Sequence, residues 1–369
     1  MNIAIFSPNK NPYSETFIQA HKNYLKGNVS YYYGHIGSIK LEGTERLVSK
    51  TLEFRFRLAR MLSNSPYAYV NQKSILKSLK QNKIDVALIE YGTHAYSLIS
   101  ILKSSKIPFV VHFHGYDASV KGVISQCNNY KEVFSNATSL IAVSRKMEQM
   151  LLDIGCPRKK LIYNVYGAQP EFESVIPTFA KKQFIAIGRF TDKKAPYYTI
   201  MAFKEIADKF PDAKLLIAGD GLLLNMCENL VKHYQLEQQV DFLGVIKPEE
   251  YKKILTDSLA FVQHSITAKS GDMEGTPVAV LEASVAGLPV IATKHAGIID
   301  VIKHGETGLL CDEHDVAAMS DHMMKVLSNI EFAKQMGSNG KKHIKQFYSL
   351  DRHINALQKT LNEAVSKDC

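Results

Sequence analysis

The sequence predicts an α/β protein made of two doubly wound, Rossmann-like domains. Short apolar strands alternate with helical patterns along the 369 residues, which is typical of parallel sheets covered by helices. The length also exceeds the size at which a single hydrophobic core stops growing. The alternation pauses after residue 172 and restarts near residue 184. We therefore expect a first domain at 1–172, a second at 173–349 and a last amphipathic helix at 350–369.

Composition narrows the class of protein. Hydrophobic residues make up 46% and charged residues 22%, as in a globular chain. No apolar run reaches the roughly 18–20 residues that span a bilayer. The first residues, MNIAIFSPNK, read as a strand without signal-peptide features. The five cysteines are scattered without CxxC or metal-like spacing, which indicates reduced thiols and a cytoplasmic protein.

The positive charge is concentrated in the first half of the chain. Residues 1–174 carry 22 Lys and Arg against 12 Asp and Glu, a net charge of +10, whereas the remaining residues carry 23 against 24. This asymmetry indicates either ordinary solubility or attraction of the first half to an anionic surface.

Six strands are expected in the first domain: 2–7, 29–33, 86–90, 109–114, 140–143 and 161–164. No GxGxxG follows the first strand, which weakens a dinucleotide-binding interpretation. A polar loop stands there instead and leads into a helix. Its Ser14 and Thr16 are either ligand contacts or members of a capping box.

The segment 44–83 is the most basic part of the chain. Apolar and basic residues interleave over 44–62 as in an amphipathic helix. Such a helix suits an anionic membrane face, through the basic residues of 46–83, or packs on its own sheet with a solvated basic edge. No nucleic-acid-binding module accompanies these residues, and we expect no nucleic acid partner.

Two histidines mark the end of the predicted strand at 109–114. Strand alternation places His112 and His114 on one face, at the carboxyl end where α/β folds bind ligands. Asp117 follows, either orienting the loop or capping a helix. His94 lies in the loop after the preceding strand.

The second half restarts with a strand at 184–187 and a basic loop that contains Gly188, Arg189 and Lys194. A guanidinium and an ammonium group above a helix N-terminus suit a diphosphate, although two such cations are also common as plain surface charges. Further strands are expected at 215–218, 240–245 and 260–263, and Gly219 opens a Gly-x-Gly turn.

The stretch 261–301 carries two carboxylates, Glu274 and Glu282, separated by seven residues. Thr276 suits an N-cap and Pro277 the first helical position, so we expect a helix to begin there. Glu274 then precedes a helix N-terminus, a ready site for phosphate, and Glu282 lies about two turns into the helix. Gly287 ends the helix and a buried strand follows at 290–293.

These residues together resemble family 4 retaining glycosyltransferases. That family's signature is Glu-Gly, a seven-residue gap to Glu-Ala, and then Gly-x-Pro-Val-Ile-Ala-Thr, as found at 274–293. The His-Gly-x-Asp loop at 114–117 and the Gly-Arg…Lys-Lys segment at 188–194 also match. FHGYDAS and SITAKSGDMEGTPVAVLEA look most like transferases of bacterial exopolysaccharide (colanic-acid type) or lipopolysaccharide assembly.

The resemblance implies the GT-B fold, with a cleft between the two domains and a C-terminal helix that crosses back to the first. It implies that Glu274 contacts the donor sugar, Glu282 the ribose, Arg189 and Lys194 the diphosphate, and His114 the reacting sugar. The other implied donor-binding residues are Gly188, Gly219, Val245, Gly275, Thr276 and Pro277. Candidate acceptor contacts are Ser14, Thr16 and His94. No Asp-x-Asp occurs, so neither a metal nor a cofactor is expected beyond the nucleotide-sugar substrate.

The expected reaction moves a hexose from a nucleotide-diphosphate sugar, with UDP favoured, to a hydroxyl of a lipid-linked saccharide. The enzyme would then be cytoplasmic or peripheral on the inner face of the cell membrane. Three alternatives remain open: a nucleotide-sugar 2-epimerase of the same fold, a non-catalytic nucleotide-sugar-binding protein, and a basic-surface binding module.

Overall fold

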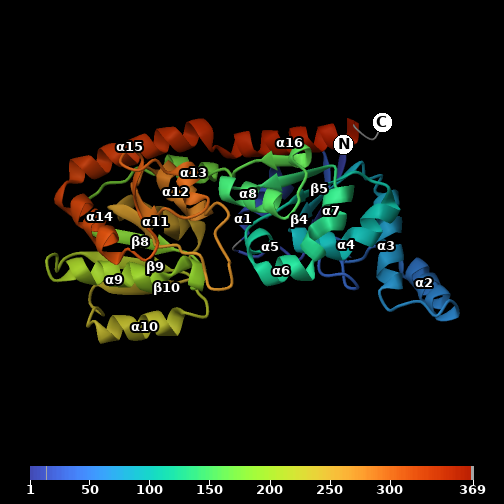
Figure 1. Ribbon diagram of the computed structural model, residues 1–369, viewed down its shortest axis with the longest axis horizontal. Coiled ribbons are helices and arrows are strands. Elements are labelled where there is room, and N and C mark those ends of the chain that lie inside the picture. Colours follow the sequence, from blue (N-terminus) through green and yellow to red (C-terminus); the bar gives the residue numbers. More distant parts are fainter. Residues whose placement is uncertain (14, 367–369) are drawn as a thin grey trace. The chain divides into compact units, whose positions relative to one another are not determined.

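The computed structural model describes residues 1–13 and 15–366 and divides into two compact units (Figure 1). Unit 1 comprises Met1–Val143, Met147–Asn164 and the described residues from Ile354 on. Unit 2 comprises Ser144–Lys146 and Val165–His353. The two predicted doubly wound α/β domains are confirmed.

Unit 1 is built on a seven-stranded sheet in the order β3-β2-β1-β4-β5-β6-β7. Its strands are β1 (Asn2–Ser7), β2 (Asn28–Tyr33), β3 (Lys40–Leu41), β4 (Val86–Glu90), β5 (Phe109–His112), β6 (Ser139–Ala142) and β7 (Leu161–Tyr163). All pairings are parallel except that of β2 with β3. The central strands β4, β5 and β6 are buried along their whole length, as expected for a parallel sheet covered on both faces.

Helices connect these strands. They are α1 (Thr16–Tyr24), α2 (Lys50–Leu62), α3 (Tyr69–Gln81), α4 (Gly92–Ser105), α5 (Tyr116–Ser119), α6 (Lys121–Gln126), α7 (Lys131–Asn136) and α8 (Arg145–Asp153), with 3₁₀ turns η1 (Asn128–Tyr130) and η2 (Arg158–Lys160). Helix α2 packs against α3 at the periphery of the unit (Figure 1).

Unit 2 has a six-stranded, all-parallel sheet in the order β10-β9-β8-β11-β12-β13. Its strands are β8 (Gln183–Ile187), β9 (Lys214–Ala218), β10 (Val240–Gly244), β11 (Ala260–Gln263), β12 (Val290–Thr293) and β13 (Gly308–Cys311). Its helices are η3 (Pro170–Ser174), η4 (Asp192–Lys194), α9 (Pro196–Ala207), α10 (Leu224–His233), α11 (Pro248–Asp257), α12 (Val278–Ala286), α13 (Ile298–Val301), α14 (Val316–Ser328) and α15 (Ile330–Phe347).

Strand order reverses beside the first strand of each sheet, between β1 and β4 and between β8 and β11. Ligands of doubly wound folds bind outside the carboxyl ends of the strands at this switch point. The topology therefore predicts that ligand-binding residues lie in the loops after β4 and β5 in unit 1, and after β8 and β11–β13 in unit 2.

The last helix, α16 (Leu350–Ser366), begins in unit 2 and continues in unit 1, so the expected return of the chain to the first unit is confirmed. We expected the first domain to reach residue 172, and the contacts divide the chain at Asn164. The reason is local, because the Val165 carbonyl accepts hydrogen bonds from the side chains of Arg352 and His353 at the start of α16.

Three details of the predicted elements are wrong. Strand β5 ends at His112, so His114 lies in the loop beyond it. Helix α2 begins only at Lys50, after an N-cap at Ser49 whose hydroxyl accepts the N–H of Leu52. Thr276 is not the cap of α12, because Pro277 takes the N-cap position with an extended backbone.

Two further features bear on expectations from composition. Four cysteines, Cys127, Cys156, Cys227 and Cys311, are free and buried, and Cys369 lies outside the described residues. Within 1–13 and 15–366, no helix combines the length and apolarity needed to cross a bilayer.

Candidate functional site

Charged side chains gather on the loops at the carboxyl edge of the unit 2 sheet. Arg189 follows β8 and Lys194 closes the short helix η4 after it. Glu274 lies in the long loop between β11 and α12, His295 follows β12 and Glu313 follows β13. Because the strands are parallel, their carboxyl ends share one edge, and residues that are far apart in the sequence are brought together there.

Lys194 and Glu274 form the central ion pair, with 3.3 Å between Nζ and Oε2. Nζ also donates to the side-chain oxygen of Gln263 at 3.3 Å. The Glu274 carboxylate is buried, and its Oε1 has no hydrogen-bond partner among the residues that the structure describes. The structure therefore presents a buried acceptor oxygen beside a cation, an arrangement suited to a ligand hydroxyl.

The electrostatics of this pair follow from burial and from neighbouring charges. Burial opposes ionisation of Glu274, but the ammonium groups of Lys194 and Lys193 outweigh it and lower the pKa of Glu274. Burial also lowers the pKa of Lys194, and the Glu274 carboxylate partly offsets that effect. Glu274 is thus held as a carboxylate, able to accept hydrogen bonds and unable to donate them.

Lys193 ties the loop of the cations to the loop of Glu274. Its ammonium contacts the Asp272 carboxylate at 3.0 Å and the Met273 carbonyl at 3.3 Å. Its own carbonyl accepts the N–H of Ile266 at 2.9 Å. Sequence reasoning singled out Lys194 of this pair and missed the tethering role of Lys193.

A histidine and a second glutamate hold the backbone of Glu274. The Glu274 N–H donates to Nε2 of His295 at 3.1 Å, so the neutral His295 ring carries its proton on Nδ1. That Nδ1 lies 2.6 Å from the Glu313 carboxylate, which also accepts the N–H of Thr267 at 2.8 Å. Sequence reasoning missed this chain, although His295 and Glu313 each follow a strand at the same sheet edge.

Two glycines allow close backbone approach. A Cβ on Gly219 would lie 1.9 Å from the carbonyl oxygen of Gly188, and its φ of +133° also disfavours any side chain. A Cβ on Gly297 would lie 2.0 Å from the carbonyl oxygen of Gly275. The predicted contacts Gly275, Thr276 and Pro277 are buried beside Glu274.

Three other predicted donor contacts, Glu282, Arg189 and Val245, do not join the Lys194–Glu274 ion pair. Glu282 is the fifth residue of α12, one turn in and not two, and among the described residues no hydrogen bond or ion pair joins it to Glu274, Lys194 or Arg189. Burial, reinforced by the charge of Glu171, raises the pKa of Glu282 to about 8. Arg189 and Val245 are exposed.

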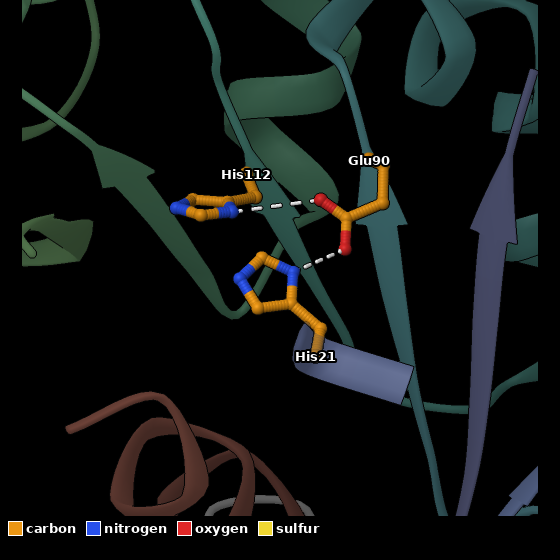
Figure 2. Close-up of side chains that lie close together, drawn as sticks. All are labelled: His21, Glu90 and His112. Carbon is orange, nitrogen blue, oxygen red and sulfur yellow. Dashed lines mark hydrogen bonds and ion pairs between the residues drawn. The ribbon is translucent and has the colours of Figure 1, made fainter. Parts of the chain in front are cut away.

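In unit 1, the carboxylate of Glu90, at the end of β4, contacts three histidine side chains. Its carboxylate lies 2.7 Å from Nδ1 of His21, 2.8 Å from Nε2 of His114 and 3.5 Å from Nδ1 of His112. Figure 2 shows His21 on α1, Glu90 on β4 and His112 on β5 pointing toward one another. Burial opposes ionisation of Glu90, but the charge of His21 and hydrogen bonds from His112 and His114 lower its pKa well below the usual range. Burial also lowers the pKa of His112, to about 3.

The loop that carries His114 is fixed by Asp117. One Asp117 oxygen accepts the N–H groups of His114 and Gly115 at 3.0 and 2.9 Å, and the other accepts that of Gly92 at 2.8 Å. Of the two roles left open by the sequence, the structure supports loop orientation. His114 is placed by this loop and by Glu90 together.

The three candidate acceptor contacts differ in their surroundings. His94 is buried on α4, burial lowers its pKa to about 3, and its Nε2 has no partner among the described residues. Thr16 is the first residue of α1 and is half-buried. Ser14 lies outside the described residues.

A metal ion could be held by three residues of unit 1, His21, Glu90 and His112, because one ligand atom of each lies within 4.8 Å of the others. Ligands about 2.1 Å from a tetrahedral ion are about 3.4 Å apart. The 2.7 Å between His21 Nδ1 and Glu90 is shorter and fits a direct hydrogen bond. The geometry therefore favours a hydrogen-bonded cluster.

Two protein-family models match this chain. The model described as Glycosyl transferases group 1 matches residues 171–343, and that described as Glycosyltransferase Family 4 matches residues 36–165. The chain therefore contains a glycosyl transferases group 1 domain and a glycosyltransferase family 4 domain. The resemblance inferred from the motifs is thereby confirmed.

Relatives of this chain include WcaL of Escherichia coli (strain K12), assigned as a colanic acid biosynthesis glycosyltransferase. It is 30% identical over 215 residues, 57% of this chain and 53% of WcaL. The amylovoran biosynthesis glycosyltransferase AmsK of Erwinia amylovora is 30% identical over 249 residues, 66% of this chain and 61% of AmsK. The matches thus span little more than half of the length of these relatives.

Among solved structures, Anabaena Alr3699/HepE in complex with UDP and glucose superposes on this chain with a TM-score of 0.77 at 15% identity. The match covers 98% of this chain and all of the other (100%). Likeness at this identity establishes the fold alone.

Proposed function

We propose that the chain is a retaining glycosyltransferase. It would move a hexose-type sugar from a nucleotide-diphosphate sugar, UDP-linked by preference, to a hydroxyl of a lipid-linked saccharide in bacterial surface polysaccharide synthesis. The observation that carries this proposal is the buried Lys194–Glu274 pair with its acceptor oxygen Oε1. The two matched glycosyltransferase domains and the names of WcaL and AmsK support the class of reaction.

In the proposed donor site, cationic side chains bind the diphosphate and carboxyl side chains bind the hydroxyls of the sugar and the ribose. Arg189 and Lys194 neutralise the diphosphate as it departs, and cations fixed in advance stabilise that charge without reorganisation. Glu274, an acceptor only, takes hydrogen bonds from the sugar hydroxyls. Glu282 meets the ribose. The nucleotide sugar is a substrate, and we propose neither a metal nor a separate cofactor.

The proposed reaction transfers the sugar in a single step at the anomeric carbon. The bond between the anomeric carbon and the phosphate oxygen breaks, and its electron pair leaves with the nucleotide diphosphate. The acceptor hydroxyl attacks the same face of the sugar, and its proton passes to the departing phosphate oxygen. His114 contacts the reacting sugar, and Ser14, Thr16 and His94 are candidate contacts of the acceptor.

A donor panel tests the reaction. Purified protein is mixed with UDP-, GDP- and TDP-sugars, with and without a lipid-linked saccharide, and nucleotide diphosphate release is followed with and without EDTA. We expect release with one donor class, dependent on acceptor and insensitive to EDTA, with the anomeric configuration retained by NMR. Epimer formation without acceptor would indicate the 2-epimerase instead. Binding without any turnover would indicate a non-catalytic protein.

We further propose that helix α2 holds the protein on the inner face of the membrane. None of its residues is buried, and Phe54, Leu58, Met61 and Leu62 are 44–79% exposed at helical spacing. Lys50, Arg55, Arg57 and Arg60 interleave with them. Exposed apolar residues with a basic edge suit a helix lying in an anionic lipid surface.

Liposome sedimentation tests this role of α2. We expect binding to vesicles rich in anionic lipid, weakened by high salt and lost in a Phe54→Ser/Met61→Ser variant. Ile176→Ser removes an equally exposed apolar side chain from unit 2 and should bind as the unaltered protein does. Equal binding by the double variant would contradict the proposal.

A further inference from the structure

The Glu90 cluster, which we define as Glu90, His21, His112 and His114, lies entirely within unit 1 and is inaccessible to solvent at Glu90. A buried carboxylate is costly unless its lone pairs are used, and here three imidazoles surround it. A buried carboxylate with three histidines at the end of β4 is unusual, and one of these histidines, His114, has an expected role in sugar transfer. The cluster is therefore expected to have a function.

The direction of the hydrogen bonds follows from the charge of Glu90. Its lowered pKa makes it a carboxylate, which can only accept. His114 must then donate from Nε2 across the 2.8 Å contact, and His21 must donate from Nδ1 across the 2.7 Å contact. In the neutral tautomer, His114 therefore carries its proton on Nε2.

The ring of His114 is also held in orientation. Phe17 stacks on it at 4.7 Å between ring centroids, and Tyr91 lies against it at 4.5 Å. Tyr91 itself donates a hydrogen bond to Glu15 at 2.9 Å. With Asp117 fixing the backbone, the plane of the imidazole and the position of its Nδ1 are both determined.

We propose that Glu90 is the positioning residue of the transfer reaction: it fixes the tautomer and the orientation of His114, the residue proposed to contact the reacting sugar. His21 and His112 serve to stabilise the Glu90 carboxylate. A carboxylate behind a histidine is a common means of fixing its tautomer. The inference rests on the proposed function for the role of His114, and on geometry alone for its tautomer.

The first test is spectroscopic and needs no substrate. Protein labelled with ¹⁵N-histidine is examined by long-range ¹H–¹⁵N correlation, and His114→Asn identifies the His114 signals. We expect the tautomer protonated on Nε2 in the unaltered protein and a mixture of tautomers in Glu90→Gln. An Nδ1-protonated His114 in the unaltered protein would overturn the proposal, even if no variant folds.

The second test is kinetic. Glu90→Gln is expected to lower kcat by roughly 10- to 100-fold with the donor KM nearly unchanged, the range found when the carboxylate that orients a metal-bound histidine is removed. Glu148→Gln is the matched control, because Glu148 is also buried in unit 1 and pairs with Arg158 at 2.9 Å. It should keep the unaltered kcat. Unchanged kcat in Glu90→Gln would overturn the positioning role.

The two proposals fail separately. If the unaltered protein transfers no sugar, the proposed function fails, while the tautomer of His114 is still decided by NMR. Elemental analysis adds a third readout. About one zinc per chain, removed by Glu90→Gln, would make the cluster a metal centre and overturn the hydrogen-bonded interpretation.

Discussion

Glu282 offers the sharpest test of the electrostatics of unit 2. It is buried on α12, and burial together with the Glu171 charge raises its pKa from 4.5 to about 8. The unfolded chain ionises this carboxyl near its ordinary pKa, whereas the folded protein resists ionisation up to about pH 8. Stability is therefore fully present below pH 4.5 and is lost as the pH rises toward 8.

The size of the effect follows from the same shift. A pKa difference of roughly 3.5 corresponds to about 4–5 kcal/mol, at 1.36 kcal/mol per unit. Less than about 1 kcal/mol of that cost is felt at pH 5, and nearly all of it at pH 9. Glu282→Gln keeps the shape of the neutral acid and removes the titration. The free energy of unfolding of the variant should exceed that of the parent by about 4 kcal/mol more at pH 9 than at pH 5.

Calorimetry at pH 5, 7 and 9, without nucleotide, measures this difference. In a domain of this size 1 kcal/mol shifts Tm by about 2–4 °C, so the transition of unit 2 should separate by roughly 10 °C at pH 9. Glu171→Gln is the control. It removes the smaller cause of the shift, so most of the pH dependence should persist.

The Glu282→Gln substitution should weaken nucleotide binding even though it stabilises the fold. If Glu282 contacts the ribose, as proposed, then Glu282→Gln weakens nucleotide binding while stabilising the protein at high pH. An equal difference in Tm between variant and parent at pH 5 and pH 9 would refute the reasoning, because it would mean that Glu282 titrates normally in the folded state.

Three further outcomes are expected. Glu274→Gln should abolish transfer while nucleotide binding by calorimetry is spared, and wild-type turnover would disprove its role. Gly219→Ala should lower the free energy of unfolding by more than about 2 kcal/mol, since its Cβ would meet backbone at 1.9 Å, and a Tm within error of the parent would contradict this. Glu313→Gln should lower kcat/KM by roughly ten- to a hundredfold through the weaker hold on His295. The exposed Glu306→Gln serves as its control and should behave as the parent.

The strand pattern and loop motifs were sufficient to predict the fold and the sheet edge at which Lys194 and Glu274 meet. Apolar runs of four to six residues mark buried parallel strands, and the polar residues directly after them had to lie at one sheet edge. Lys194 and Glu274 could therefore be placed together from sequence, because each stands in such a loop beside a recognisable motif. The cap of α12 was mispredicted, because Thr276 and Pro277 both suit a helix start and propensity does not separate them by one position.

Only the tertiary structure could decide which side chains meet across different loops. Glu90 is the last residue of an apolar strand and carries no motif, yet helix α1 and strand β5 bring His21 and His112 to its carboxylate. His295 and Glu313 are likewise unremarkable in sequence, and their bond depends on the neighbouring positions of β12 and β13. Residue type and periodicity determine elements locally, whereas hydrogen bonds between distant loops, and the pKa shifts that burial imposes, exist only once the sheets are assembled.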